Sequence, residues 1–149
     1  MISLICEKYG ITNYTINSDG SIDVDGNVYL SFNDLTELPL SFNKVTGWFD
    51  CSRNKLTSLK GCPRWIGRYF SCYNNRLTSL EFSPEYVGSY FSCETNQLTD
   101  NYCIAEIVGN FHTTLKQDGM ILDYNAVTNY NEWRKLYKRK MILDDIFNM

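Results

Sequence analysis

The sequence reads FDCSRNKLTSL over residues 49–59 and FSCYNNRLTSL over residues 70–80. The two stretches begin 21 residues apart and share an aromatic residue, a cysteine, an asparagine and two leucines at matching positions. Agreement at a fixed spacing is typical of repeat architectures, in which each repeat makes one structural unit that stacks on the next. The two stretches therefore predict a solenoid whose coils each take 21 residues.

The same spacing extends the pattern beyond these stretches in both directions. Asparagine recurs at positions 33, 54, 75 and 96, leucine at 35, 56, 77 and 98, and cysteine at 51, 72 and 93. Phenylalanine recurs at 49, 70 and 91, and a branched aliphatic residue recurs at 45, 66 and 87. Val108 and Gly109 are expected to continue the phase. We therefore assign residues 27–109 to the repeats.

The repeat unit, written F-x-C-x-x-N-x-L-T-x-L with a proline-containing return and a V-G pair, resembles the leucine-rich repeat. It is most similar to the repeats of short leucine-rich-repeat proteins of bacteriophages and other viruses. The resemblance implies a leucine-rich-repeat solenoid of about four coils, in which each coil adds one strand to a parallel β-sheet. Pro63 and Pro84 favour mostly extended returns over helical ones.

Alternation of side chains along each strand predicts which residues enter the core. Phe49 and Cys51 should point inward, while Trp48 and Asp50 point outward. The asparagines should form an internal ladder, because a buried amide is tolerated only when it is hydrogen-bonded. We interpret the cysteines as buried packing residues, because the chain lacks the C-x-x-C pair typical of zinc sites. We therefore expect no metal and no cofactor.

Both ends of a solenoid need a cover, and the sequence suggests one at each end. Residues 2–9 predict a short helix, and residues 14–24 predict a hairpin around Asp19-Gly20, which together form an N-terminal cap over residues 1–26. Residues 113–121 contain a second Asp-Gly step and predict another hairpin or an edge strand. Because apolar residues recur at helical spacing in the last 20 residues, we assign residues 110–149 to a C-terminal hairpin and helix cap. Residues 1–149 are then a single domain.

Composition and motifs argue against several classes of protein. The net charge is −3, which provides no basic field for nucleic acid, and no apolar run is long enough to span a membrane. The N-terminus lacks the features of a signal peptide, so we expect reduced thiols and a cytoplasmic protein. The sequence contains no phosphate-binding loop, no metalloprotease motif and no nucleophile elbow, which favours a protein that is not an enzyme.

The outward strand positions are the candidate binding surface, because exposed tryptophan and tyrosine side chains are typical of interaction hot spots. The alternatives are that these rings only stabilise neighbouring strands, or that a terminal segment covers them. The candidate residues are Tyr29, Trp48, Asp50, Tyr69, Tyr73, Tyr90 and Glu94.

The leading functional hypothesis is a non-enzymatic protein-interaction module that occupies the surface of a partner protein. The viral resemblance implies a host partner, such as a defence protein, and a place in the host cytoplasm. One alternative is a self-assembling structural protein. Another is a nucleic-acid-binding protein that uses a basic C-terminal helix, although a solvated face on a capping helix is the more ordinary interpretation. The basic residues of that helix are Arg134, Lys135, Lys138, Arg139 and Lys140.

Overall fold

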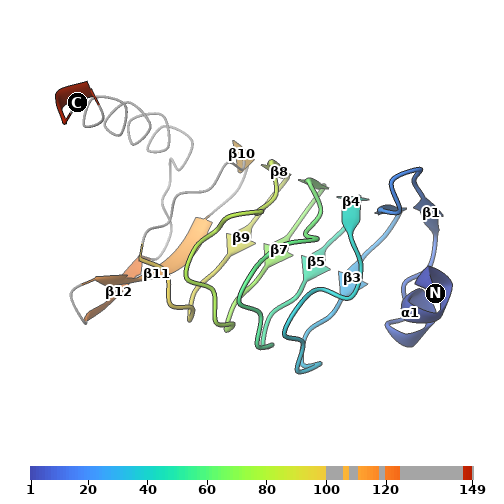
Figure 1. The fold of residues 1–149 in the computed structure, drawn as a ribbon, viewed down its shortest axis with the longest axis horizontal. Helices are drawn as coiled ribbons and strands as arrows, with labels where there is room; N and C mark the ends of the chain where they lie inside the picture. The colour runs from blue at the N-terminus through green and yellow to red at the C-terminus, as the bar shows by residue number, and fades with distance from the viewer. Residues whose placement is uncertain (100–105, 108–110, 118–119, 125–145, 149) are drawn as a thin grey trace.

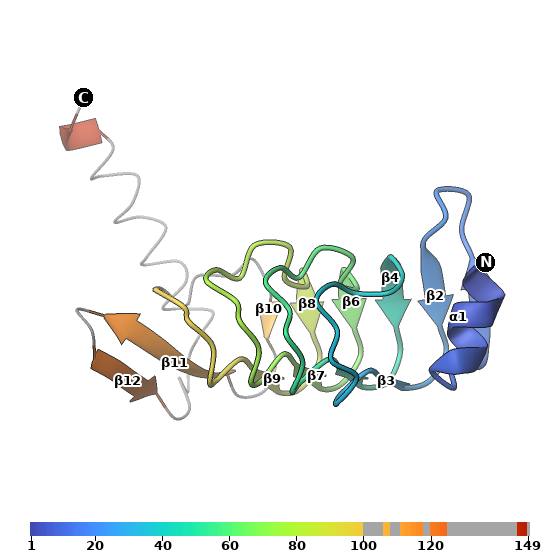
Figure 2. The same ribbon diagram turned by 60° about the horizontal axis from the view of Figure 1, so that its bottom comes forward.

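The computed structural model describes residues 1–99, 106–107, 111–117, 120–124 and 146–148. In these residues the chain forms a parallel-strand β-solenoid with 21-residue spacing between coils (Figures 1 and 2). The regular coils make about three turns, compared with about four expected from the sequence. Residues 100–105, Val108 and Gly109 belong to the last expected repeat and lie outside the described residues.

Two sheets form the walls of the solenoid, and each contains six strands in the described part of the chain. The first sheet has the spatial order β1 (Tyr14–Ile16), β2 (Ile22–Val24), β4 (Phe42–Val45), β6 (Trp65–Ile66), β8 (Tyr86–Val87) and β10 (Glu106–Ile107). The second sheet has the order β12 (Met120–Tyr124), β11 (Phe111–Gln117), β9 (Phe91–Ser92), β7 (Phe70–Ser71), β5 (Phe49–Asp50) and β3 (Val28–Tyr29).

Each coil contributes one strand to each sheet, with a short corner between the two strands. The returns are extended, as the prolines predict, but they also pair with one another in parallel and so form the first sheet. The sequence predicted only one parallel sheet. Glycine is required at the corner, because a Cβ atom on Gly67 would overlap the carbonyl oxygen of Thr46, and one on Gly88 would overlap that of Gly67.

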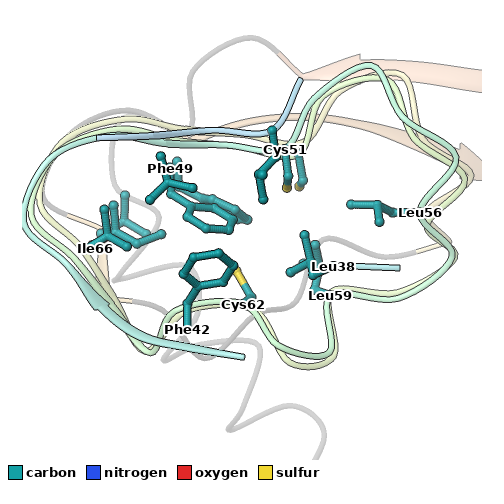
Figure 3. Close-up of a cluster of buried hydrophobic side chains, with 14 of the residues drawn as sticks. Leu38, Phe42, Phe49, Cys51, Leu56, Leu59, Cys62 and Ile66 are labelled. Atoms are coloured by element: carbon teal, nitrogen blue, oxygen red, sulfur yellow. The ribbon is translucent and has the colours of Figure 1, made fainter. Parts of the chain in front are cut away.

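A thin apolar core fills the space between the sheets. Figure 3 shows Phe49 and Cys51 on one side of a coil, Phe42 on the other, and leucines at the far end. The phenylalanine column is fully buried and continuous, with ring centroids 6.2 Å apart between Phe49 and Phe70 and 4.7 Å apart between Phe70 and Phe91. Alternation along the strands therefore places the phenylalanine and cysteine columns inside, as the sequence predicts.

The expected asparagine ladder is present where each coil leaves the second sheet. The Asn75 side-chain amide donates to the carbonyls of Cys51 (3.0 Å) and Cys72 (3.1 Å), and its oxygen accepts from the Leu56 N–H (3.0 Å). Asn54 and Asn96 make equivalent bonds one coil away in each direction. Each asparagine therefore joins neighbouring coils by satisfying backbone groups that the strands leave unpaired.

The N-terminal end contains the predicted elements. The helix α1 (Ile2–Lys8) places Cys6 in the core cluster, and Ile11 follows it there. Strands β1 and β2 pair in antiparallel fashion, and Asp19 in their turn accepts a hydrogen bond from the Ser21 N–H (3.0 Å). Strand β2 also pairs in parallel with β4, with an irregularity after Ile22. The hairpin thus supplies the first parallel strand of the solenoid.

The register of the last described coil differs from the prediction. Val87 pairs with Ile107, whereas an unbroken period would align it with Val108, and Phe91 pairs with Phe111. This coil is therefore one residue shorter than the 21-residue period. An unbroken period would align the polar residue His112 with the phenylalanine column, and the shorter spacing gives that position to Phe111 instead.

Strands β11 and β12 form an antiparallel pair that extends the second sheet at its C-terminal edge, in the region where residues 113–121 predict a hairpin or an edge strand. The predicted C-terminal helix, including its five basic residues, lies outside the described residues except for residues 146–148. In the described part of the chain, no helix has the length and apolar character that crossing a membrane requires.

Candidate functional site

Three aromatic rings from successive coils lie side by side along the second sheet. We call Trp48, Tyr69 and Tyr90 the aromatic stripe. The ring of Trp48 meets that of Tyr69 edge to face, with centroids 5.8 Å apart. Tyr69 and Tyr90 are stacked, with centroids 5.1 Å apart and an angle of 21° between the planes. The three predicted residues of this column are therefore brought together.

The positions of these rings follow from the repeat. Each stripe residue comes directly before a buried phenylalanine, so its side chain points away from the core. Asn27 begins the column, and its side-chain oxygen accepts a hydrogen bond from the Trp48 N–H (2.8 Å). Trp48 is 44% exposed, while Tyr69 and Tyr90 are half-buried because each contacts the neighbouring ring.

A hollow of about 450 Å³ lies beside the stripe on the same sheet. We call it the serine hollow, because the small, buried side chains of Ser52, Ser71 and Ser92 line it. Large side chains on both sides leave space above these serines. The other lining residues are Ser31, Phe32, Asp50, Arg53, Tyr69, Tyr73 and Glu94.

Two carboxylates give the hollow its electrostatic character. Asp50 accepts a hydrogen bond from the Ser52 N–H (2.9 Å), and Glu94 accepts one from the Ser92 hydroxyl. Burial raises the pKa of Tyr69, and the Asp50 and Glu94 carboxylates raise it further, while hydrogen bonds with Ser71 and Ser92 oppose the rise. Burial and the Glu94 carboxylate raise the pKa of Tyr90 to about 12. Both tyrosines are therefore neutral at physiological pH.

One arginine on the rim of the hollow is held by aromatic rings. The Arg53 guanidinium lies 4.8 Å from the ring centroid of Phe32 and 5.6 Å from that of Tyr73. Phe32 and Arg53 are one repeat apart and both have left-handed backbones, with φ of 58° and 53°. Phe32 was not predicted from the sequence as a binding residue, although its spacing of one repeat from Arg53 could have indicated it.

The structure therefore divides the predicted binding residues into two groups. Asp50, Tyr69, Tyr73 and Glu94 line the hollow, and Trp48 and Tyr90 extend the stripe. Tyr29 is half exposed on strand β3 and, in the described part of the chain, lies outside the residues that line the hollow. The predicted basic contacts at Arg134, Lys135, Lys138, Arg139 and Lys140 lie outside the described residues.

A second aromatic pair lies on the other sheet and was missed by the sequence analysis. Trp65 and Tyr86 are stacked with centroids 5.4 Å apart, and the Lys44 ammonium lies 5.0 Å from the Trp65 ring. They form a column because Lys44, Trp65 and Tyr86 occupy paired positions on β4, β6 and β8. The sequence does contain a signal for this column, because Trp65 and Tyr86 each come directly before an aliphatic residue of the return, one repeat apart.

The cysteine column is buried in the core as reduced thiols. The Cys51 thiol donates to the carbonyl oxygen of Ser71 (3.3 Å), and burial raises the pKa of Cys51 and Cys62. A buried thiol with a raised pKa is a poor nucleophile, because the thiolate is the reactive form. The column therefore acts in packing.

The chain matches no family model, no curated protein and no solved structure. The function of the surface must therefore be inferred from its side chains.

Proposed function

We propose that this protein is a non-enzymatic protein-interaction module of the leucine-rich-repeat type, and that the aromatic stripe and the serine hollow form its binding surface. The repeat identity is supported by the 21-residue spacing and by the asparagine ladder. The second parallel sheet is a departure from the pattern expected from the resemblance.

The observation that carries the proposal is the aromatic stripe on an open sheet face. Tryptophan and tyrosine are enriched at interaction hot spots because they offer a large apolar area with few rotatable bonds. The serine hollow beside the aromatic stripe gives the surface a shape to which a partner protein can be complementary. Exposed patches of this kind on repeat proteins commonly mark interaction sites.

Ring geometry favours a protein partner over a nucleic acid. A base or a sugar would bind best against an open ring face, and Tyr69 and Tyr90 cover one face of each other. The exposed parts of Trp48, Tyr69 and Tyr90 can pack against apolar side chains of a partner. If nucleic acid were the partner, binding would weaken steeply as salt is raised.

The viral resemblance suggests the source of the partner. On that basis alone we propose a host protein, encountered in the host cytoplasm and inhibited or modulated by occupation of its surface. Self-assembly is the competing proposal, and light scattering of the purified chain at high concentration addresses it. A strict monomer would count against self-assembly.

The proposed function is tested by affinity capture from host lysate with the wild type and the variant Trp48→Ala/Tyr69→Ala/Tyr90→Ala. The matched control is Trp65→Ala/Tyr86→Ala, which removes an aromatic pair from the other sheet. All three proteins are first compared by circular dichroism to show that they are folded. We expect one protein to be captured by wild type and control and lost by the stripe variant. Equal capture by all three would place the binding site elsewhere.

A further inference from the structure

The serine hollow has a chemical character different from that of the aromatic stripe beside it. Its buried floor consists of hydroxyl groups, and two carboxylates, Asp50 and Glu94, are among its lining residues. Asp50 is half-buried and forms no ion pair with any described residue. A half-buried carboxylate without a counterion is favourable to a cation that enters the hollow.

We propose that the serine hollow receives one basic side chain, an arginine or a lysine, from the partner protein that covers the aromatic stripe. The inference rests on the proposed function, because the stripe supplies the apolar contact that would hold the partner over the hollow. A cationic group in the hollow would meet carboxylate acceptors and serine hydroxyls, which match the donors of a guanidinium or an ammonium group.

The carboxylates act on the neighbouring tyrosines of the stripe. The charged groups that shift the pKa of Tyr69 are the carboxylates of Asp50 and Glu94, and both shift it upward. The Glu94 carboxylate acts in the same direction on Tyr90. The Asp50 and Glu94 carboxylates therefore lie close enough to the stripe to place negative charge beside it, which favours a cation there.

Among the described residues that line the hollow, Arg53 is the one cation, and its guanidinium is held on the rim by aromatic rings. It packs over the rings of Phe32 and Tyr73 and forms no ion pair with a described residue. It therefore leaves Asp50 available and places a positive charge on the rim. A partner with an acidic residue next to its basic one would fit both charges.

The donor set favours an organic cation over a metal ion. In the described part of the chain, no group of three or more histidine, cysteine, aspartate or glutamate side chains could hold a metal ion. The hollow has a volume of about 450 Å³, which falls in the range of sites that enclose small organic groups. A long basic side chain fits this space, and its aliphatic part would contact Tyr69 and Tyr73.

The proposal is tested by nuclear magnetic resonance titration of the full ¹⁵N-labelled chain with three probes. These are N-acetyl-arginine amide, N-acetyl-lysine amide and the neutral analogue N-acetyl-citrulline amide. We expect saturable shifts of the Ser71 and Ser92 amide signals with the arginine probe, the lysine probe or both, and none with citrulline. The charged probe that binds identifies the preferred cation. Equal shifts with citrulline, or no saturable shift with any probe, would overturn the proposal.

Variants then assign the effect to the carboxylates. Asp50→Asn and Glu94→Gln should each weaken binding of the charged probe about tenfold, because each removes a charge-assisted contact. Glu81→Gln is the matched control, since it makes the same charge change at an exposed site outside the hollow. Unchanged binding in both hollow variants, with dispersed spectra that show a folded chain, would also overturn the proposal.

The two proposals fail in different ways. Suppose that affinity capture depends on the stripe, but that Asp50→Asn and Glu94→Gln capture the same partner as well as the wild type. The proposed interaction surface is then supported, and the proposal that a basic side chain enters the hollow is wrong. If the basic probes bind the hollow but capture does not depend on the stripe, the hollow is a cation site and the proposed interaction surface is wrong.

Discussion

The ring of Tyr69 lies stacked on the ring of Tyr90, one coil further along the solenoid, with 5.1 Å between their centroids. Such cross-strand pairs add about 0.5–1.5 kcal/mol beyond the area that they bury. The same contact therefore stabilises the second sheet and shapes its open face. Stability and the proposed binding surface are linked through these side chains.

Alkaline pH should weaken the fold through Tyr90. Its pKa is raised from 10.0 to about 12 in the folded chain, so the neutral hydroxyl contributes stability that is fully present below pH 10 and lost as the pH rises toward 12. We expect the melting temperature to fall over this interval, and to fall less in Tyr90→Phe, when followed by circular dichroism. An identical pH dependence in the two proteins would contradict the assignment.

Leu77→Ala should lower the free energy of unfolding by about 2–5 kcal/mol, because Leu77 is fully buried in the leucine column and its loss leaves a cavity between coils. Chemical denaturation measures the change. Thr78→Ala is the control, since Thr78 is exposed and its substitution should change stability by less than about 0.5 kcal/mol. A similar small effect at Leu77 would be inconsistent with the register.

Asn75→Ala should destabilise the solenoid by about 1–3 kcal/mol, because it leaves the buried Leu56 N–H without its acceptor. The Cys51 and Cys72 carbonyls each lose one of their two asparagine donors and keep the other. The measurement is again chemical denaturation. Gln97→Ala removes an exposed amide and serves as the control. If both variants lose the same small amount, the ladder contributes little to stability.

Gly67→Ala should lower the free energy of unfolding by about 1–3 kcal/mol, because the added methyl group would overlap the Thr46 carbonyl and push two coils apart. Thermal unfolding followed by circular dichroism reports the loss. Ser89→Ala, at an exposed position in the next corner, should melt close to the wild type. Equal melting of Gly67→Ala would show that the corner tolerates a side chain.

The spacing of the repeat predicts much of this fold because stacking converts a sequence period into a column of contacts. Phe49, Phe70 and Phe91 align in the structure because residues one period apart occupy the same place in successive coils. The asparagine ladder follows for the same reason, since each amide meets the same backbone groups one coil away. The aromatic stripe could likewise be predicted from alternation along the strand.

Features that depend on pairing between coils were missed. The first sheet arises because extended returns with branched residues at Val45, Ile66 and Val87 come close enough to form hydrogen bonds. Ile107 takes the next place in their column because the last described coil is one residue shorter than the period. A periodic pattern predicts only the unshifted register. The serine hollow depends on how far neighbouring side chains project from the sheet, and the repeat spacing alone does not predict this.

The sequence by itself determined the period, the inward columns and the outward position of Trp48, Tyr69 and Tyr90, because all of these depend on the local geometry of a strand. Only the tertiary structure decided that the rings cover one another, that Arg53 packs between Phe32 and Tyr73, and that Asp50 lines a hollow. These contacts join side chains from different coils, and their geometry is fixed only when the coils stack.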